Sequence, residues 1–465
     1  MTTLVDSSLD NKSNNQLVLR NNSNQVSDDT TIKDLDDTSI KDSDDTSIED
    51  SDEDFVVRGL SGFRNIGNTC YMNSTLQCLD AVTTFSSWLR SGMYKKRLCN
   101  NIIEDIGDKV RKEQNKDENE VVHVSKKDVQ EQFDNSIVHQ LSRLFEYKWK
   151  YNWKITPKTF KNLIGELNSE FAGYGLNDSQ EVLSFILDRI HEETKTKVNV
   201  KFCDISDKLK EIIKFRKECS QKLADKSVPV ENKKEISDQY NNFISQYPNE
   251  KTILNAYIYW KKYIVNSHSI ITDLFTGLFY SRIECKECHQ SSDSFEPFTN
   301  LSIETPDKED ISLQECLINF SKTENLDGDN QYNCSNCKKK VNATKTMYIW
   351  EPPEALIIHL KRFKNTYRYT MKTSSKVEFP IDELKLTNNL CPFHKKDSKY
   401  ELCGITEHLG GSWNMGHYIA YCKNGINKLW YEFNDASVTH IPRKILEEEI
   451  VTKNAYVLFY SLKRD

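Results

Sequence analysis

Two Cys-x-x-Cys pairs limit most strongly what this chain can fold into. Cys285 and Cys288 form the first pair and Cys334 and Cys337 the second, with residues 289–333 between them. Four thiolates are the ligand set of a tetrahedral structural zinc site. Because the interval is longer than in compact zinc modules, the metal would join two hairpins of one subdomain. No coordination position is left open for chemistry, so we expect structural Zn2+; the alternative is a degenerate ribbon that holds no metal.

The number of cysteines and the residues at the N-terminus indicate the cellular compartment. The chain has 13 cysteines, an odd number, and residues 1–25 contain no apolar block of the kind found in a signal peptide. No run of about 18 apolar residues marks a membrane span, so no membrane association is expected. We therefore expect a soluble intracellular protein of the cytoplasm or nucleus. Its cysteines should be metal ligands, a nucleophile or buried thiols rather than a disulfide framework.

Charge is divided unevenly along the chain. The net charge is −7, but residues 1–54 carry 15 acidic and 4 basic side chains, a balance of −11, which leaves −7 − (−11) = +4 for the rest. The same segment contains the repeats DDTTIKDL, DDTSIKDS and DDTSIEDS. It has too little apolar surface to offset its ordering entropy, so we expect a disordered acidic tail, with an interaction tail as the alternative. The body has no dense Lys/Arg stripe, so no nucleic-acid partner is expected.

Cys70 occupies a position suited to a nucleophile. Residues 65–79 read NIGNTCYMNSTLQCL, a Gly/Asn loop followed by an apolar-periodic run, which predicts a helix capped by Asn68 or Thr69. Cys70 then lies in the first turn. There the positive end of the helix dipole favours a thiolate, and the first N–H groups are placed to hold an oxyanion. The alternative is a buried structural cysteine.

The rest of the pattern is helical first and strand-rich later. We expect mostly helices over residues 85–165, and a further helix that begins with a capping box of Asp178 and Glu181. Residues 200–262 look like an insertion, helical in period at first and then aromatic, and we interpret the aromatic run as helix packing. From Ile270 the pattern favours strands.

The strongest hairpin signal lies near the C-terminal end. A Gly/Ser/Asn-rich loop over residues 410–416 precedes two strands joined by an Asn-Gly turn. If Lys423 and Lys428 pair, every facing pair of residue numbers sums to 851, which places His417 opposite Asn434. Facing residues have Cβ atoms about 5 Å apart, so the imidazole and the amide would be within hydrogen-bonding reach.

These residues supply most of what a thiol hydrolase needs. Cys70, His417 and Asn434 occur in the order Cys, His, Asn, which is the order of papain-like thiol proteases. Asn65 precedes the nucleophile and is a candidate oxyanion donor, while Asp435 can share the orienting role of Asn434. Cys70 and His417 are 417 − 70 = 347 positions apart, so a subdomain must be inserted between them. The zinc ribbon is the natural candidate.

Seven ordered stretches together resemble the ubiquitin-specific protease family of cysteine deubiquitinases. They are NIGNTCYMNSTLQCL, NDSQEVLSFILDRIHEE, the two Cys-x-x-Cys pairs, LIIHLKRF, VEFP, GHYIAY and WYEFNDASV. The resemblance runs from about Leu60 to Tyr460 and implies an α+β, papain-like fold. It implies a helical thumb over about 55–199, the insertion, and zinc-ribbon fingers and palm over about 263–465. The implied activity is hydrolysis of the isopeptide or peptide bond after the C-terminal glycine of ubiquitin.

By motif position the resemblance assigns the catalytic roles. It implies that Cys70 forms a thioester as nucleophile, that His417 is the base, and that Asn434 is the third member. Asn65 matches the oxyanion donor, and Asp435 matches the acidic residue that assists. The implied partners are ubiquitin and ubiquitinated proteins.

Substrate contacts follow from the same resemblance, with one departure. Asp178, Glu181 and Tyr418 match positions that hold the tail of ubiquitin. The family usually has Gln-Gln-Asp where this chain has Leu176-Asn177-Asp178. Two other hypotheses are a non-catalytic ubiquitin-binding module of the same fold and a protease for another ubiquitin-like modifier.

Overall fold

We describe a computed structural model of residues 57–464, apart from residues 118–119, 121, 202–204, 307, 366–369, 394–397 and 413–414. The predicted acidic tail over residues 1–54 lies outside the described residues. Among the described helices, none is both long and apolar enough to cross a membrane.

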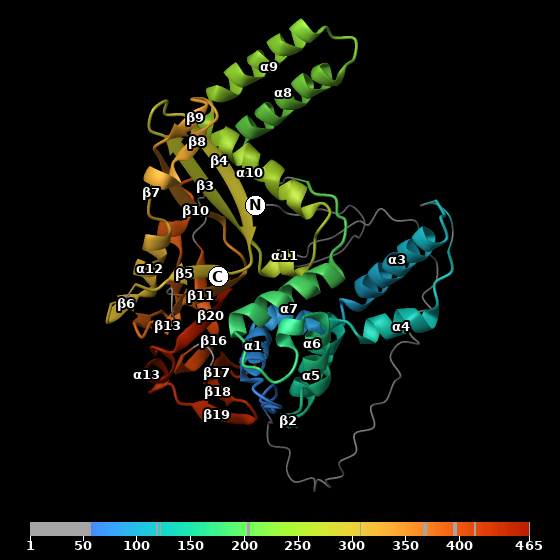
Figure 1. Cartoon of the computed structure of the whole chain (residues 1–465), viewed down its shortest axis with the longest axis vertical. Coiled ribbons are helices and arrows are strands. Elements are labelled where there is room, and N and C mark those ends of the chain that lie inside the picture. The colour runs from blue at the N-terminus through green and yellow to red at the C-terminus, as the bar shows by residue number, and fades with distance from the viewer. Residues whose placement is uncertain are drawn as a thin grey trace.

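In the described part of the chain, the α-helices α1 to α7 form the N-terminal part of the molecule (Figure 1). Residues 85–165 are mainly helical, as the apolar periodicity predicts. A parallel strand pair, β1 (Gly62–Phe63) and β2 (Lys154–Ile155), ties the start of this part to its end. The helices are α1 (Cys70–Ala81), α2 (Thr83–Arg90), α3 (Lys95–Glu113), α4 (Lys126–Asp134), α5 (Ile137–Lys150), α6 (Lys158–Leu167) and α7 (Ser179–Thr194).

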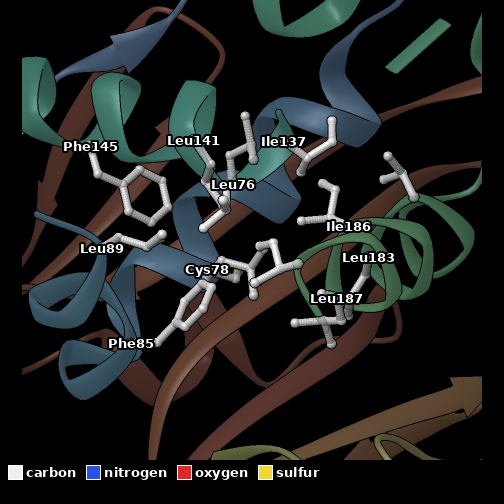
Figure 2. Packing of buried hydrophobic residues seen from close by; sticks show 14 of the residues in the cluster. Leu76, Cys78, Phe85, Leu89, Ile137, Leu141, Phe145, Leu183, Ile186 and Leu187 are labelled. Atoms are coloured by element: carbon white, nitrogen blue, oxygen red, sulfur yellow. The ribbon is translucent and has the colours of Figure 1, made fainter. Parts of the chain in front are cut away.

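Helix α1 lies at the centre of this part and is buried along its whole length. Leu76 packs among side chains from α2, α5 and α7 (Figure 2). The opposite side of α1 rests on the palm sheet, so even its polar residues are enclosed. Gln77, for example, donates from Nε2 to the carbonyl oxygen of Ser61 (3.0 Å). A helix enclosed in this way holds the residues at its N-terminus in fixed positions.

The palm is a sheet in the order β19-β18-β17-β16-β20-β11-β5, with β15 (Leu384–Lys385) paired to β16. All neighbours are antiparallel except β11 and β5. Both faces are buried: along β20, Val457 and Phe459 join the core shared with the helices, while Leu458 and Tyr460 join a second core on the far side. The strands are β5 (Leu301–Glu304), β11 (Ala355–Lys361), β16 (Lys399–Ser412), β17 (Met415–Lys423), β18 (Trp430–Asn434), β19 (Ser437–Ile441) and β20 (Ala455–Leu462).

A second sheet, in the order β4-β3-β10-β7, extends away from the palm together with the hairpin of β8 and β9 (Figure 1). Its members are β3 (Gly277–Cys285), β4 (Ser291–Phe298), β7 (Glu324–Leu326), β8 (Tyr332–Cys334), β9 (Lys339–Val341) and β10 (Ala343–Glu351). The remaining small elements are α11 (Ile270–Leu274), α12 (Leu313–Phe320), α13 (Leu446–Ile450), β6 (Asp310–Ser312), β12 (Phe363–Asn365), β13 (Thr370–Lys372) and β14 (Lys376–Glu378).

The insertion over residues 200–262 is built mainly of three helices, α8 (Asp207–Ala224), α9 (Val230–Ser245) and α10 (Pro248–Ile264). Its helical character therefore extends beyond the first part that the sequence indicated. The aromatic run lies on α10, where Trp260 packs against Leu278 and Trp350 of the second sheet. Tyr257 joins a small separate core with α8 and α9, so the aromatic residues pack helices, as we interpreted them.

Two sequence expectations were wrong in detail. The segment from Ile270 begins with α11 rather than a strand, because Ser269 and Thr272 form a reciprocal capping box. The expected loop over residues 410–416 is much shorter, because β16 continues to Ser412 and β17 resumes at Met415, where these two residues pair.

Candidate active site

Cys70 is the first residue of α1 and is almost fully buried. Thr69 is the N-cap residue, but the predicted side-chain cap is absent because Thr69 Oγ1 turns back and accepts from Ile66 N (3.1 Å). The loop before it is held instead by Asn65 Oδ1, which accepts from the backbone N–H groups of Gly67 (3.1 Å) and Thr69 (3.0 Å). The first N–H groups of α1 have no carbonyl partner within the helix, so they remain donors beside the thiol.

His417, on β17, lies between the thiol and an amide. Its Nε2 atom is 2.8 Å from Asn434 Oδ1, so Nε2 carries the proton and Nδ1 is left for the sulfur of Cys70. The hydrogen bond with Cys70 is the main reason that the pKa of His417 is raised to about 9. Asn434 and Asp435 add to this, while burial opposes it. The predicted Cys, His and Asn residues are therefore together.

The predicted register of the hairpin was wrong by two residues. Lys423 pairs with Trp430, so facing numbers sum to 853 rather than 851. The reason is a wider loop: Asn424 N donates to Leu429 O (2.8 Å), and Asn424 Oδ1 accepts from Ile426 N (2.9 Å) inside the turn. His417 and Asn434 meet just beyond the paired part of the ladder, which ends at Ala420 and Phe433.

Asn65 and Asp435 contact one another rather than acting separately. Asn65 Nδ2 donates to Asp435 Oδ2 (3.0 Å), and the same carboxylate oxygen lies 3.9 Å from His417 Nε2. Asp435 adopts the left-handed conformation with φ 49°, in the turn between β18 and β19. An amide carries two N–H groups, so the one that holds Asp435 leaves the other for an oxyanion.

Of the three residues expected to contact the substrate, Asp178 and Glu181 lie at the start of α7 and Tyr418 lies on β17. Asp178 caps α7 by accepting from Gln180 N (2.7 Å), but the reciprocal Glu181 half of the predicted capping box is not formed in this helix. Asp178 Oδ2 also accepts from the hydroxyl of Tyr456 (2.5 Å), and burial raises the pKa of Asp178. The Tyr418 ring centroid is 6.1 Å from that of Tyr456.

The partners of these residues carry no signal in the sequence. Tyr456 is an aromatic residue at the start of a buried strand, and nothing in its pattern signals a contact with α7. Asn177 donates from Nδ2 to the hydroxyl of Tyr71 (3.2 Å), the residue that follows Cys70 on α1. Asn73 on α1 was also overlooked, although it occurs one turn after Cys70.

The four cysteines of the two Cys-x-x-Cys pairs converge where the β3–β4 and β8–β9 hairpins meet. Their sulfur atoms all lie within 4.8 Å of one another, with Cys285 and Cys337 3.9 Å apart and Cys288 and Cys334 3.7 Å apart. Ligands at 2.3 Å from a tetrahedral ion are about 3.8 Å apart, so the spacing fits zinc. Each pair closes one hairpin, β3–β4 or β8–β9, and the backbone N–H of its second cysteine donates to the sulfur of the first (3.5 Å).

Comparison with known proteins gives the family. The model of the family described as ubiquitin carboxyl-terminal hydrolase matches residues 61–460. The chain belongs to this family. A probable ubiquitin carboxyl-terminal hydrolase of Acanthamoeba polyphaga mimivirus is 32% identical over 431 residues, covering 86% of this chain and 90% of that relative. Ubiquitin carboxyl-terminal hydrolase Usp2 of Drosophila melanogaster is 30% identical over 404 residues, covering 86% of this chain but 35% of the relative.

Solved structures agree with the family assignment. The SAGA deubiquitinating module Ubp8/Sgf11/Sus1/Sgf73 bound to monoubiquitin contains a chain with TM-score 0.57 and 25% identity, covering 88% of this chain and 70% of that one. These findings confirm the predicted α+β fold of the ubiquitin-specific proteases. They also confirm the predicted enzyme class, a cysteine-type deubiquitinase that cleaves after the C-terminus of ubiquitin.

Proposed function

We propose that Cys70 is the nucleophile of this deubiquitinase, His417 its acid and base, and Asn434 the group that orients His417. The observation that carries the proposal is the short contact between His417 Nε2 and Asn434 Oδ1, which leaves Nδ1 to face Cys70 at the start of α1. This is the arrangement that nucleophilic catalysis by a thiol requires.

The reaction proceeds in two acyl-transfer steps. The Cys70 thiolate attacks the carbonyl carbon of the C-terminal glycine of ubiquitin, and the resulting oxyanion accepts from the first-turn N–H groups of α1 and from Asn65 Nδ2. The protonated His417 gives its proton to the leaving lysine amine, the C–N bond breaks, and a thioester remains. Neutral His417 then takes a proton from water, whose hydroxyl attacks the thioester and releases ubiquitin and the Cys70 thiolate.

Asp178, Glu181 and Tyr418 are proposed to bind the extended tail of ubiquitin. The oxygens of Asp178 already accept hydrogen bonds from Gln180 N, from Tyr456 OH and from the backbone N–H of Glu181. Each carboxylate oxygen has a second lone pair, so Asp178 can still accept from a peptide N–H of the tail. These internal bonds fix the direction in which the remaining lone pair points.

We also propose that Cys285, Cys288, Cys334 and Cys337 hold one zinc ion, which would join the two hairpins and supply stability rather than chemistry. The proposed division of the chain is a thumb over about 55–199, an insertion over about 200–262, and fingers and palm over about 263–465.

A panel of modifier reporters tests the proposal. Ubiquitin and several ubiquitin-like modifiers, each with a fluorogenic amide at its C-terminus, are offered to the enzyme at equal concentration. We expect kcat/KM to be highest for ubiquitin. Faster turnover of another modifier would contradict the substrate assignment, and no turnover of any reporter would contradict the mechanism.

The raised pKa of His417 predicts an alkaline limit to activity. Since the leaving amine needs the imidazolium, kcat/KM for a ubiquitin amide should fall with a midpoint near pH 9. The contribution of this group to stability is complete below its ordinary pKa of about 6.5 and is lost as the pH rises through about 9. In Asn434→Ala, one of the interactions that raise the pKa of His417 is missing. The midpoint of the fall in kcat/KM should therefore move to lower pH. An unmoved midpoint, measured in rate profiles at constant ionic strength, would contradict the orienting role.

A further inference from the structure

Asn73 is a buried amide one helical turn after Cys70, and the proposed mechanism does not use it. Its Nδ2 atom donates to Asp435 Oδ1 at 2.8 Å and also lies 3.2 Å from Phe63 O and 3.4 Å from Arg64 O. All three neighbours are acceptors, so the orientation of the amide is fixed: the nitrogen must face them.

Asp435 is held from two sides by amides that flank the nucleophile in sequence. Asn73 binds Oδ1, and Asn65 binds Oδ2 at 3.0 Å. The backbone of Asp435 is fixed as well, because its carbonyl oxygen accepts from Phe63 N at 2.9 Å. The chain approaches so closely here that a Cβ atom on Gly62 would lie 2.6 Å from Asp435 O.

We propose that Asn73 is a positioning residue that sets the distance between Cys70 and His417 by holding the Asp435 carboxylate. This proposal rests on the catalytic roles proposed above. Cys70 and Asn73 share one rigid helix, whereas His417 and Asp435 belong to the β17–β19 part of the palm. The bond from Asn73 to Asp435 therefore joins α1, which carries the thiol, to the turn after Asn434, the residue that binds the imidazole.

The positions of Asp435 and Asn434 around His417 indicate what happens when the bond from Asn73 to Asp435 is lost. Asp435 Oδ2 lies 3.9 Å from His417 Nε2, while Asn434 Oδ1 occupies the hydrogen-bonding position at 2.8 Å. A carboxylate released on the Oδ1 side can rotate toward Nε2 and compete with Asn434. The imidazole would then turn away from the thiol, and a small displacement of a reacting group costs rate far more than binding.

Asn73→Ala tests the proposal against a matched control. Gln77 is the next buried amide on the same side of α1, and its Nε2 donates to Ser61 O at 3.0 Å, but it does not contact Asp435. We expect Asn73→Ala to lower kcat for a ubiquitin amide about 10- to 100-fold with KM within about threefold, the pattern of a transition-state defect. Gln77→Ala, which also removes the acceptor of Lys148 Nζ, should lower the melting temperature at least as much and leave kcat within about threefold.

A double-mutant cycle separates positioning from general packing. If Asn73 acts through Asp435, adding Asn73→Ala to Asp435→Ala should change kcat by less than about twofold. If kcat of the double variant falls by the product of the two single losses, the proposal is overturned. An unchanged kcat in Asn73→Ala, or an equal loss of kcat in Gln77→Ala, would also overturn it. Should Asn73→Ala not fold, Asn73→Ser provides the same comparison. An inactive Cys70→Ala beside an unaffected Asn73→Ala would overturn only this inference and leave the proposed function standing.

Discussion

Replacing Cys70 with alanine is expected to lower kcat for a ubiquitin C-terminal amide by about 10⁴-fold or more, because the side chain that forms the acyl intermediate is removed. The pKa of His417 should fall at the same time, since its hydrogen bond with Cys70 is the largest cause of the raised value. Initial-rate assays measure the first effect, and NMR titration of the His417 ring measures the second.

A second thiol on the same helix provides the control for this experiment. Cys78 is fully buried, lies 3.9 Å from the sulfur of Cys422, and has a pKa raised by burial. Cys78→Ala should therefore lower stability while retaining turnover. A loss in Cys70→Ala far smaller than about 10⁴-fold, or an equal loss in Cys78→Ala, would contradict the assignment of the nucleophile.

Loss of the zinc site is expected to produce the second large effect, on stability. Cys288→Ser removes one of the four proposed ligands, which would join the β3–β4 and β8–β9 hairpins through the metal. In small zinc-binding modules the binding free energy, about 10 kcal/mol or more, is itself folding free energy. We expect this variant to lose stoichiometric zinc and more than about 4 kcal/mol of unfolding free energy.

Cys316→Ala is the matched control, because Cys316 is a buried thiol of the second palm core that does not belong to the sulfur cluster. It should retain one zinc per chain and lose about 1 kcal/mol. Elemental analysis and chemical denaturation, with and without a chelator, measure both quantities. An unmodified protein that contains no zinc and does not respond to chelation would contradict the proposal.

Much of the fold was accessible from sequence because it depends on local patterns. The apolar periodicity predicted α1 and α7, and the pattern from Ile270 onward predicted that strands dominate the later part of the chain. The hairpin arithmetic was less reliable, because the Asn424 side chain widened the turn and moved two residues out of the strand. A side chain that bonds inside a turn leaves little trace in a residue pattern.

The same distinction applies to the candidate site, where local motifs predicted some of the residues and only the folded structure identifies the others. Cys70, His417 and Asn434 belong to recognisable motifs, and the structure brings them together. Asn73 and Tyr456 act through contacts with residues hundreds of positions away, at Asp435 and Asp178. A buried asparagine on a helix or a tyrosine on a strand carries no local signal of such a partner, so only the folded structure identifies these contacts.

Covalent capture tests the catalytic assignment most directly. Ubiquitin carrying a C-terminal electrophile is mixed with the enzyme, and the adduct is mapped by peptide mass spectrometry. We expect one ubiquitin per chain, attached at Cys70, and no adduct in Cys70→Ala. Attachment at another cysteine, or ubiquitin binding without any adduct, would contradict the assignment of Cys70 as the nucleophile.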